Sequence, residues 1–316
     1  MAADPQVPQM RAVRFQDYGP ATNLMVADID RPQPKEGEVL VRVRATGVNA
    51  IDWKLRAGYL QARMPVELPH TPGFDLAGTV EQVGSGVSDF TVGDDVFGRG
   101  AATYAEYAIA PVKNIALKPR SISFEEAATL PIGGVTAWVG LFDAADLQPG
   151  QRLLVQGGAG GVGSFAVQLG HWKGAYVIAT TSTANVDYVR SLGADEVIDY
   201  TTTKFEDAVH DVDVVFDTVG GEVTDRSRVV LKPGGILVAG AGMADPEKAA
   251  AHGVRTSMVQ SPEVIRPVLE ELARLVESGA IKPQVGRVFQ LSDAAQAHAV
   301  VETGHGRGRT ILQVAG

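Results

Sequence analysis

The residue pattern with the clearest chemical meaning is a glycine-rich run over 157–163, Gly-Gly-Ala-Gly-Gly-Val-Gly. Its glycines match the spacing G-x-G-x-x-G, and the run follows an apolar stretch over 152–155 and precedes a helix-like one. There the first glycine permits a tight turn, the second lets the backbone approach a pyrophosphate, and the third lets helix and strand pack closely. The helix N-terminus adds unpaired N–H groups and partial positive charge. The pattern predicts a dinucleotide site rather than a purely structural turn, with contacts from Gly158, Ala159, Gly160, Gly161, Val162 and Gly163.

The residues after the second strand of this unit indicate which dinucleotide binds. An NAD site normally places Asp or Glu there to hold both ribose hydroxyls. Here residues 179–183 read Ala-Thr-Thr-Ser-Thr, without an acid. Small hydroxyl groups can donate hydrogen bonds to a 2′-phosphate that a carboxylate would repel. This favours NADP(H), with Thr181, Ser182 and Thr183 as candidate contacts, and the alternative is that they are ordinary loop residues.

Two further strand ends are expected to line the nicotinamide pocket. Ligands of open parallel sheets bind outside the carboxyl ends of the strands. Strands predicted over 212–216 and 235–238 end beside small residues, for which a simple glycine turn is the alternative reading. The candidates are Thr218, Val219, Gly240, Ala241 and Gly242.

These residues need an α/β framework, which the second half of the chain predicts. From Ser123 onward, short apolar runs alternate with helix-like stretches, a texture typical of a parallel sheet covered on both faces. Ser123 and Glu126 have the spacing of a capping box and predict a helix start. Strands are expected over 152–155, 176–179, 196–198, 212–216 and 235–238, and helices over 165–173 and 186–192.

The first half of the chain has a different texture. Residues 10–122 carry short alternating runs separated by glycine and proline turns, which predicts a mostly antiparallel β domain. Strands near 284–291 and 310–314, flanked by helices over 263–278 and 294–302, have the same β texture. We therefore expect the chain to return to the first domain, with domains of 1–122 plus 264–316 and of 123–263.

Composition excludes several classes of function. A net charge of −9 argues against nucleic acid or an anionic membrane as partner, and the absence of cysteine excludes disulfides and thiolate chemistry. We see no apolar run near the ~18 residues of a membrane span. The polar start, Met1 to Met10, lacks signal-peptide character and is expected to be a tail. A cytoplasmic location is the expectation.

The chain resembles the zinc-free branch of the medium-chain dehydrogenase/reductases, the quinone oxidoreductase and enone reductase group. The resemblance implies a GroES-like β-rich catalytic domain plus a Rossmann doubly wound parallel sheet, with the active site in the cleft between them. It also implies, by analogy, a homodimer formed through the Rossmann sheet edge. The segments that carry it are residues 37–44, 47–52, 72–75, 92–97, 128–131 and 134–137.

The positions of zinc ligands in related dehydrogenases are altered here. Zinc-dependent relatives place a Cys near Asn49 and Gly-His-Glu where residues 73–75 read Gly-Phe-Asp. The only histidine within residues 1–122, His70, has no zinc-like spacing to Asp52 or Asp75. We therefore expect no metal.

Without a Lewis acid, an isolated ketone is a poor hydride acceptor, because its alkoxide would be unsupported. A conjugated acceptor spreads the charge over an enolate or hydroquinone anion. The expected activity is an NADPH-dependent reductase of quinones or of the C=C bond of α,β-unsaturated carbonyls. The alternatives are an enoyl thioester reductase of polyketide-type biosynthesis and a non-catalytic NADPH-binding sensor.

Further residue roles follow from the resemblance. Asn49 would lie by the nicotinamide ribose, and Asp52 would order the loop. Lys54 and Tyr59 would polarise the carbonyl or relay a proton, unless they are an exposed charge and a cleft-lining aromatic. Thr136 would contact the nicotinamide or its ribose.

The resemblance also bears on the 2′-phosphate. Ser182, Thr183 and Tyr200 would belong to its group of contacts. The usual lysine of relatives is replaced by Asn185-Val186, which predicts a weaker NADPH preference. Arg190 and Arg307 are the candidates to supply the missing charge.

Overall fold

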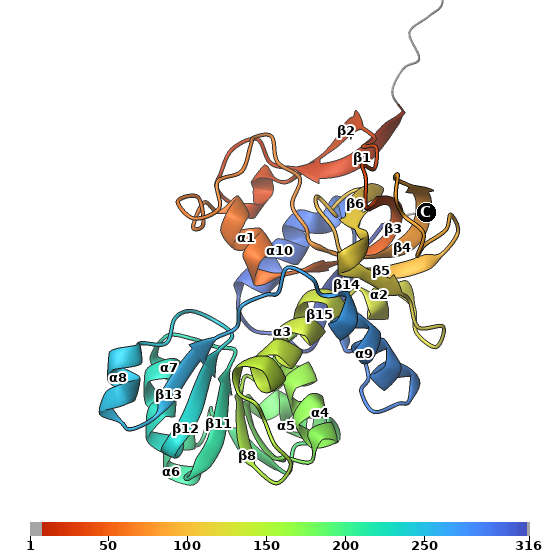
Figure 1. Ribbon diagram of the computed structural model, residues 1–316. Helices are drawn as coiled ribbons and strands as arrows, with labels where there is room; N and C mark the ends of the chain where they lie inside the picture. The colour runs from red at the N-terminus through yellow and green to blue at the C-terminus, as the bar shows by residue number, and fades with distance from the viewer. Residues whose placement is uncertain (1–7, 315–316) are drawn as a thin grey trace, which may run out of the picture. The chain divides into compact units, whose positions relative to one another are not determined.

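The computed structural model describes residues 8–314, so residues 1–7 of the expected N-terminal tail lie outside the described residues. Two compact units divide the chain (Figure 1). Unit 1 comprises 8–132, 263–277 and 285–314, and unit 2 comprises 133–262 and 278–284. Unit 1 extends past the boundary expected at residue 122 because α2 (Phe124–Ala127) packs on the sheet of that unit. The predicted capping box is confirmed there, since the Glu126 N–H donates to Ser123 Oγ at 3.1 Å and the Ser123 N–H to Glu126 Oε2 at 2.8 Å.

Unit 1 is built on a seven-stranded, mostly antiparallel sheet. The alternating residues of β3 (Glu38–Val48) bury Val39, Val41 and Val43 against the same core as Leu76. The last strand, β15 (Arg309–Gln313), pairs antiparallel with β3, which confirms that the chain returns to this unit. The other strands are β4 (Asp75–Val83), β5 (Asp95–Arg99), β6 (Tyr107–Pro111), β7 (Ile115–Leu117) and β14 (Val285–Gln290), with β1 (Gln9–Arg14) and β2 (Met25–Asp30) as a separate hairpin.

Besides α2, two helices of unit 1 pack on this sheet and a third packs on one of them. Helix α10 (Ala294–Glu302) spans the predicted residues and packs against α1 (Ala50–Arg56) and β15. Helix α9 (Arg266–Glu277) packs on β7. The helix α1 follows β3 after one residue, so the loop that precedes it is held by the longest strand of the unit.

Unit 2 is the predicted doubly wound fold. Six parallel strands run in the order β10-β9-β8-β11-β12-β13, with the chain reversing its direction of travel beside β8. Leu154, Ile178 and Val215 form the fully buried centre, as expected of a sheet covered on both faces. The strands are β8 (Arg152–Gln156), β9 (Tyr176–Thr181), β10 (Glu196–Asp199), β11 (Val212–Asp217), β12 (Leu231–Ala239) and β13 (Arg255–Met258). The helices are α3 (Val135–Trp138), α4 (Gly163–Lys173), α5 (Val186–Ser191), α6 (Phe205–Ala208), α7 (Glu222–Arg226) and α8 (Pro246–Ala251).

The helical stretch Phe124–Ala144 corrects the expectation about apolar runs. It is long and apolar enough for a membrane span, with a mean hydropathy of 1.2 over its most apolar window. Of that window, 67% is buried inside the protein. Helices in the core of a globular protein meet the same criteria of length and composition, and the burial of this one is of that kind.

Candidate active site

The glycine loop joins β8 to α4 at the carboxyl edge of the parallel sheet. The Gly158 N–H donates to the Thr180 carbonyl at 2.9 Å, which ties the loop to the end of β9. A Cβ on Gly163 would lie 2.1 Å from the Gly157 carbonyl oxygen, so the helix can begin there only with glycine. A Cβ on Gly160 would meet nothing closer than 3.4 Å. Packing therefore explains Gly163, whereas the space over Gly160 is open to a ligand.

The loop also offers free hydrogen-bond donors. The N–H groups of Ala159, Gly161 and Val162 donate to no acceptor within residues 8–314. No side chain caps the start of α4, whose 11 residues direct the positive end of the helix dipole at the loop. Three free donors, an open approach at Gly160 and an uncapped helix fit the pyrophosphate of a dinucleotide.

The end of β9 carries the hydroxyl residues predicted to contact the 2′-phosphate. Thr181 is buried, Ser182 is partly exposed and Thr183 is exposed. Tyr200 is half exposed, and its N–H donates to the Thr181 carbonyl at 3.0 Å. The structure thus brings these four residues together at one sheet edge.

One acid at this edge was missed from the sequence. Thr183 donates its hydroxyl proton to Asp199 Oδ2 at 2.7 Å, and Asp199 ends the neighbouring strand β10. Hydrogen bonds from Thr183 and Thr201 hold the pKa of the Asp199 carboxyl below its usual range. The residue pattern predicts an acid of this kind only at the end of β9, whereas Asp199 ends the next strand, in register with Thr181.

The ends of β11 and β12 are organised by the buried Asp217. Its carboxylate accepts the N–H groups of Val219 at 2.9 Å and Gly220 at 3.1 Å, while its carbonyl accepts the Gly240 N–H at 2.8 Å. The Thr218 hydroxyl donates to the Gln156 carbonyl at 2.7 Å, so it is engaged by the end of β8. Ala241 also donates to the Asp217 carbonyl, and Gly242 takes a φ of +77°. The exposed side chain here is that of Val219.

Thr136 lies in the same unit, on α3, and is half-buried. Its hydroxyl makes no hydrogen bond with another side chain or backbone group in the part of the chain that the structure describes. It is therefore available to a ligand.

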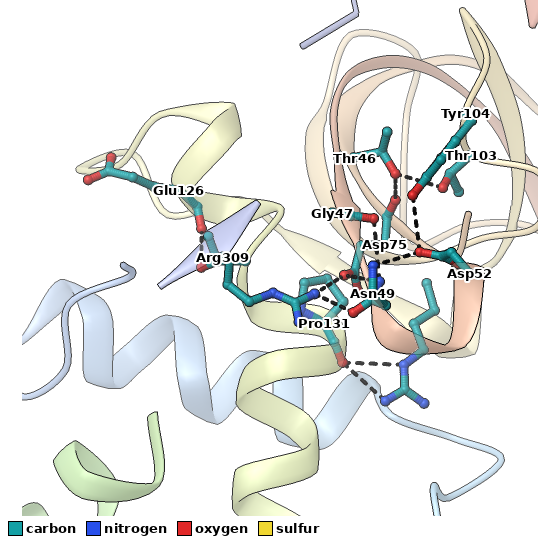
Figure 2. A network of polar contacts seen from close by, with 12 residues as sticks. Thr46, Gly47, Asn49, Asp52, Asp75, Thr103, Tyr104, Glu126, Pro131 and Arg309 are labelled. Carbon is teal, nitrogen blue, oxygen red and sulfur yellow. Dashed lines mark hydrogen bonds and ion pairs between the residues drawn. The ribbon is translucent and has the colours of Figure 1, made fainter. Parts of the chain in front are cut away.

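In unit 1 a buried ionic cluster fixes Asn49 (Figure 2). Asp75 Oδ2 accepts from Arg309 Nη2 at 2.6 Å and from Asn49 Nδ2 at 2.9 Å. Arg309 also donates to the side-chain oxygen Oδ1 of Asn49, and none of the three side chains is more than 6% exposed. The buried carboxylate of Asp75 is therefore neutralised by an arginine.

Sequence reasoning missed Arg309 because 234 residues separate it from Asp75. The available signal was the last strand: β15 pairs with β3, and Thr310 lies opposite Val48, the residue before Asn49. Arg309 is therefore delivered to the end of β3.

A second buried chain of polar groups begins at Asp52. Asp52 Oδ2 accepts the Asn49 N–H at 2.7 Å and the Tyr104 hydroxyl at 3.2 Å, and the His298 Nε2 lies 3.2 Å from that hydroxyl oxygen. Burial raises the pKa of the Asp52 carboxyl to about 7 and lowers the pKa of His298 to about 3. Asp52 completes the capping box at the start of α1, so its contacts order the loop.

The predicted catalytic side chains differ in how exposed they are and in how firmly other groups of the protein hold them. Tyr59 is 74% exposed and its ring lies edge-on to Trp53, with 5.7 Å between centroids. Lys54 Nζ lies 5.7 Å from the centroid of the same indole. Asn49, in contrast, uses both its amide and its carbonyl oxygen inside the cluster.

The predicted residues fall into two sets. Unit 2 gathers the glycine loop with the ends of β9 to β12, while Asn49, Lys54, Tyr59 and Arg307 belong to unit 1. Arg190 is paired with Asp187 at 3.0 Å. Within residues 8–314, no three His, Asp or Glu side chains are grouped so that they could hold a metal ion.

Two family models match the chain. One, the alcohol dehydrogenase GroES-like domain, covers residues 35–120, and one described as a zinc-binding dehydrogenase covers residues 192–312.

Characterised relatives match over almost the whole chain. An NADPH-dependent alkenal/one oxidoreductase of Arabidopsis thaliana is 38% identical, over 99% of this chain and 82% of the relative. A 2-methylene-furan-3-one reductase of Solanum lycopersicum is 37% identical over 96% of this chain and 79% of its own length. A chloroplast envelope quinone oxidoreductase homologue of Arabidopsis thaliana is 31% identical, over 96% and 98%.

Solved structures also match over almost the whole chain. A quinone oxidoreductase of Coxiella burnetii superimposes with a TM-score of 0.90, at 34% identity over 98% of this chain and 100% of the other. A mycobacterial protein complexed with NADPH gives 0.86, at 32% identity over 96% and 99%. The CurK enoyl reductase gives 0.88, at 29% identity over 98% and 100%.

The comparisons overturn the expected cytoplasmic location. Two of the three relatives are named as chloroplastic or as chloroplast envelope proteins. The expectation was wrong because it rested on residue composition, and a folded enzyme of this kind has the same composition whichever compartment it occupies.

Proposed function

Because this chain belongs to the medium-chain dehydrogenase/reductases, in their quinone oxidoreductase and enone reductase group, we propose that it reduces conjugated acceptors with NADPH. The acceptors are quinones and the C=C bond of α,β-unsaturated carbonyls. NADPH, when bound, supplies the hydride.

The observation that carries the proposal is the glycine loop of unit 2. Its three free N–H groups and the open backbone at Gly160 suit a pyrophosphate. Ser182, Thr183 and Tyr200 are assigned to the adenosine end. Thr136, Thr218, Val219 and the residues Gly240 to Gly242 are assigned to the nicotinamide end. Arg307 remains a candidate for the 2′-phosphate.

The proposal includes independence from zinc. The carboxylate of Asp75 is held by Arg309 and Asn49, so a cation already neutralises the acid where zinc-dependent relatives have a ligand. Without a metal, only an acceptor that spreads its developing charge is reduced readily. Full activity after exhaustive chelation tests this point, and activity that returns only with added zinc refutes it.

In the acceptor site, Lys54 and Tyr59 are the donors toward the developing oxyanion. Lys54→Ala and Tyr59→Phe are each expected to lower kcat by about 100-fold, since a positioned acid contributes about 10²- to 10⁴-fold. Asn49 acts as a positioning residue, because its side chain is engaged by the cluster.

The matched control for Tyr59→Phe is Tyr176→Phe. Tyr176 is 41% exposed and begins β9, at the opposite edge from the glycine loop. It should leave kcat unchanged. Equal rates for both variants would remove Tyr59 from the chemistry.

The second candidate is an enoyl thioester reductase, favoured by the likeness to the CurK enoyl reductase. A panel of a 2-alkenal, benzoquinone and a crotonyl thioester, each with NADPH, separates the two. Faster turnover of free enones or quinones supports the proposal, and turnover of the thioester alone selects the alternative. Tight NADPH binding without any turnover would identify a sensor.

A homodimer completes the proposal. The edge strand β13 leaves one side without a strand partner among the described residues, and a second copy could extend the sheet there. Light scattering should then give about twice the 33.3 kDa chain mass.

A further inference from the structure

The carboxyl edge of β9 and β10 carries a negative charge that would repel the 2′-phosphate of the proposed cofactor. Asp199, the last residue of β10, lies in register with Thr181, the last residue of β9. Its side chain therefore lies among the hydroxyl groups assigned to the 2′-phosphate. This inference rests on the proposed function, because it concerns the same nucleotide site.

Asp199 already holds the protons of the nearby hydroxyls. Thr183 donates to Asp199 Oδ2 at 2.7 Å, and Thr201 donates its hydroxyl to Oδ1 at 2.7 Å and its N–H at 3.0 Å. The two threonine oxygens are 2.9 Å apart. Thr183, predicted from the sequence to donate to a phosphate, is thus oriented toward a carboxylate instead.

The same distances bring phosphate and carboxylate close. If Thr183 turned its hydroxyl proton to a phosphate oxygen about 2.8 Å away, that oxygen would lie no more than about 5.5 Å from Asp199 Oδ2, because the Thr183 and Asp199 oxygens are 2.7 Å apart. The carboxyl is ionised at neutral pH, since the threonine hydrogen bonds lower its pKa. A 2′-phosphate adds charge of about −1.5 to −2 there.

Neither cation on the neighbouring elements forms an ion pair with Asp199 among the described residues. Arg190 of α5 forms an ion pair with Asp187 at 3.0 Å. Lys204 follows β10 as an exposed residue at the start of α6. The Asn185 amide donates to Ser182 Oγ at 3.2 Å, so the position of the relatives' lysine is occupied by a neutral side chain.

We propose that Asp199 is a specificity-determining residue that narrows the preference for NADPH over NADH, by setting a carboxylate beside the 2′-phosphate position. With NADH, the same carboxylate can accept a hydrogen bond from the ribose hydroxyl. The site therefore accommodates both cofactors more evenly than its hydroxyl residues alone would predict.

The test is the isosteric Asp199→Asn, which removes the charge and leaves an acceptor for Thr183. Fluorescence titration should show NADPH binding strengthened about three- to tenfold, the effect of a unit charge at this range when the pair is screened as in bulk water. The NADH affinity should stay constant or fall. The gain should shrink as salt is added, because the interaction is partly exposed.

The control is Glu196→Gln, which removes the same charge from the other end of β10, about 10 Å away. It should leave the NADPH-to-NADH ratio of affinities unchanged. Calorimetry with 2′,5′-ADP and 5′-AMP repeats the comparison without nicotinamide or turnover.

The possible outcomes distinguish a failure of the proposed function from a failure of the role proposed for Asp199. If the parent protein binds neither dinucleotide, the proposed function fails. If it binds them but the ratio is unchanged or falls in Asp199→Asn, or rises equally in Glu196→Gln, the role of Asp199 is overturned and the proposed function stands.

Discussion

At the scale of residues, the buried Asp75–Arg309 pair is the contact on which the Asn49 loop depends. Removing one partner leaves the other charge buried, which costs about 3–5 kcal/mol in comparable pairs. Arg309→Gln should therefore lower the free energy of unfolding by about this amount in urea titrations. The double variant Asp75→Asn/Arg309→Gln should recover part of the loss, because no charge remains unpaired. If the double variant lost as much free energy of unfolding as the two single variants together, the two residues would not be acting as a pair.

The neighbouring groups Asp52 and His298 predict a pH dependence with opposing signs. Asp52 has a folded pKa of about 7 against an ordinary 3.8, so the folded protein holds a proton that the unfolded chain releases. Its contribution to stability falls as pH rises from about 4 to 7. His298 has a folded pKa of about 3 against 6.5, so its contribution falls as pH drops from about 6.5 to 3.

Between about pH 4 and 6.5 the two slopes cancel in the parent protein. Relative to it, Asp52→Asn should lose stability toward acid by about 1.4 kcal/mol per pH unit, and His298→Gln should lose it toward neutral pH by a similar amount. Urea titrations across this range measure both slopes. Parallel curves for the parent and both variants would show that these groups titrate normally.

At the scale of elements, two glycines of the loop serve different purposes: Gly163 is required for folding and Gly160 for ligand binding. Gly163→Ala places a Cβ 2.1 Å from the Gly157 carbonyl oxygen and should cost about 1–3 kcal/mol of stability, as overpacking does. Gly160→Ala meets no close neighbour and should leave stability nearly unchanged. It should weaken NADPH binding about tenfold or more, equivalent to about 1.4 kcal/mol. Thermal denaturation and NADPH titration of the two variants check this, and a Gly160→Ala that binds normally would place the pyrophosphate elsewhere.

Elements were more predictable than contacts between them. The parallel sheet, the capping box at Ser123 and helix Ala294–Glu302 follow from local patterns, which depend on residues close in sequence. Arg309 and Asp199 were missed because each reaches its site through pairing between strands. The buried His298 gave no local signal either, since its partner Tyr104 is 194 residues away.

At the scale of the whole molecule, the chain assigns its two tasks to two compact units. Unit 2 presents the loop and strand ends proposed for NADPH. Unit 1 presents a half-buried lysine, an exposed tyrosine and a buried aspartate that an arginine neutralises. Reduction of conjugated acceptors is the chemistry that this combination supports.

The most direct test is product analysis after chelation, using NADPH that carries deuterium in its transferable position and a 2-alkenal as acceptor. We expect the saturated aldehyde with one deuterium at the β-carbon, formed at the same rate before and after chelation. An allylic alcohol with deuterium on the carbonyl carbon, formed only when zinc is present, would contradict it.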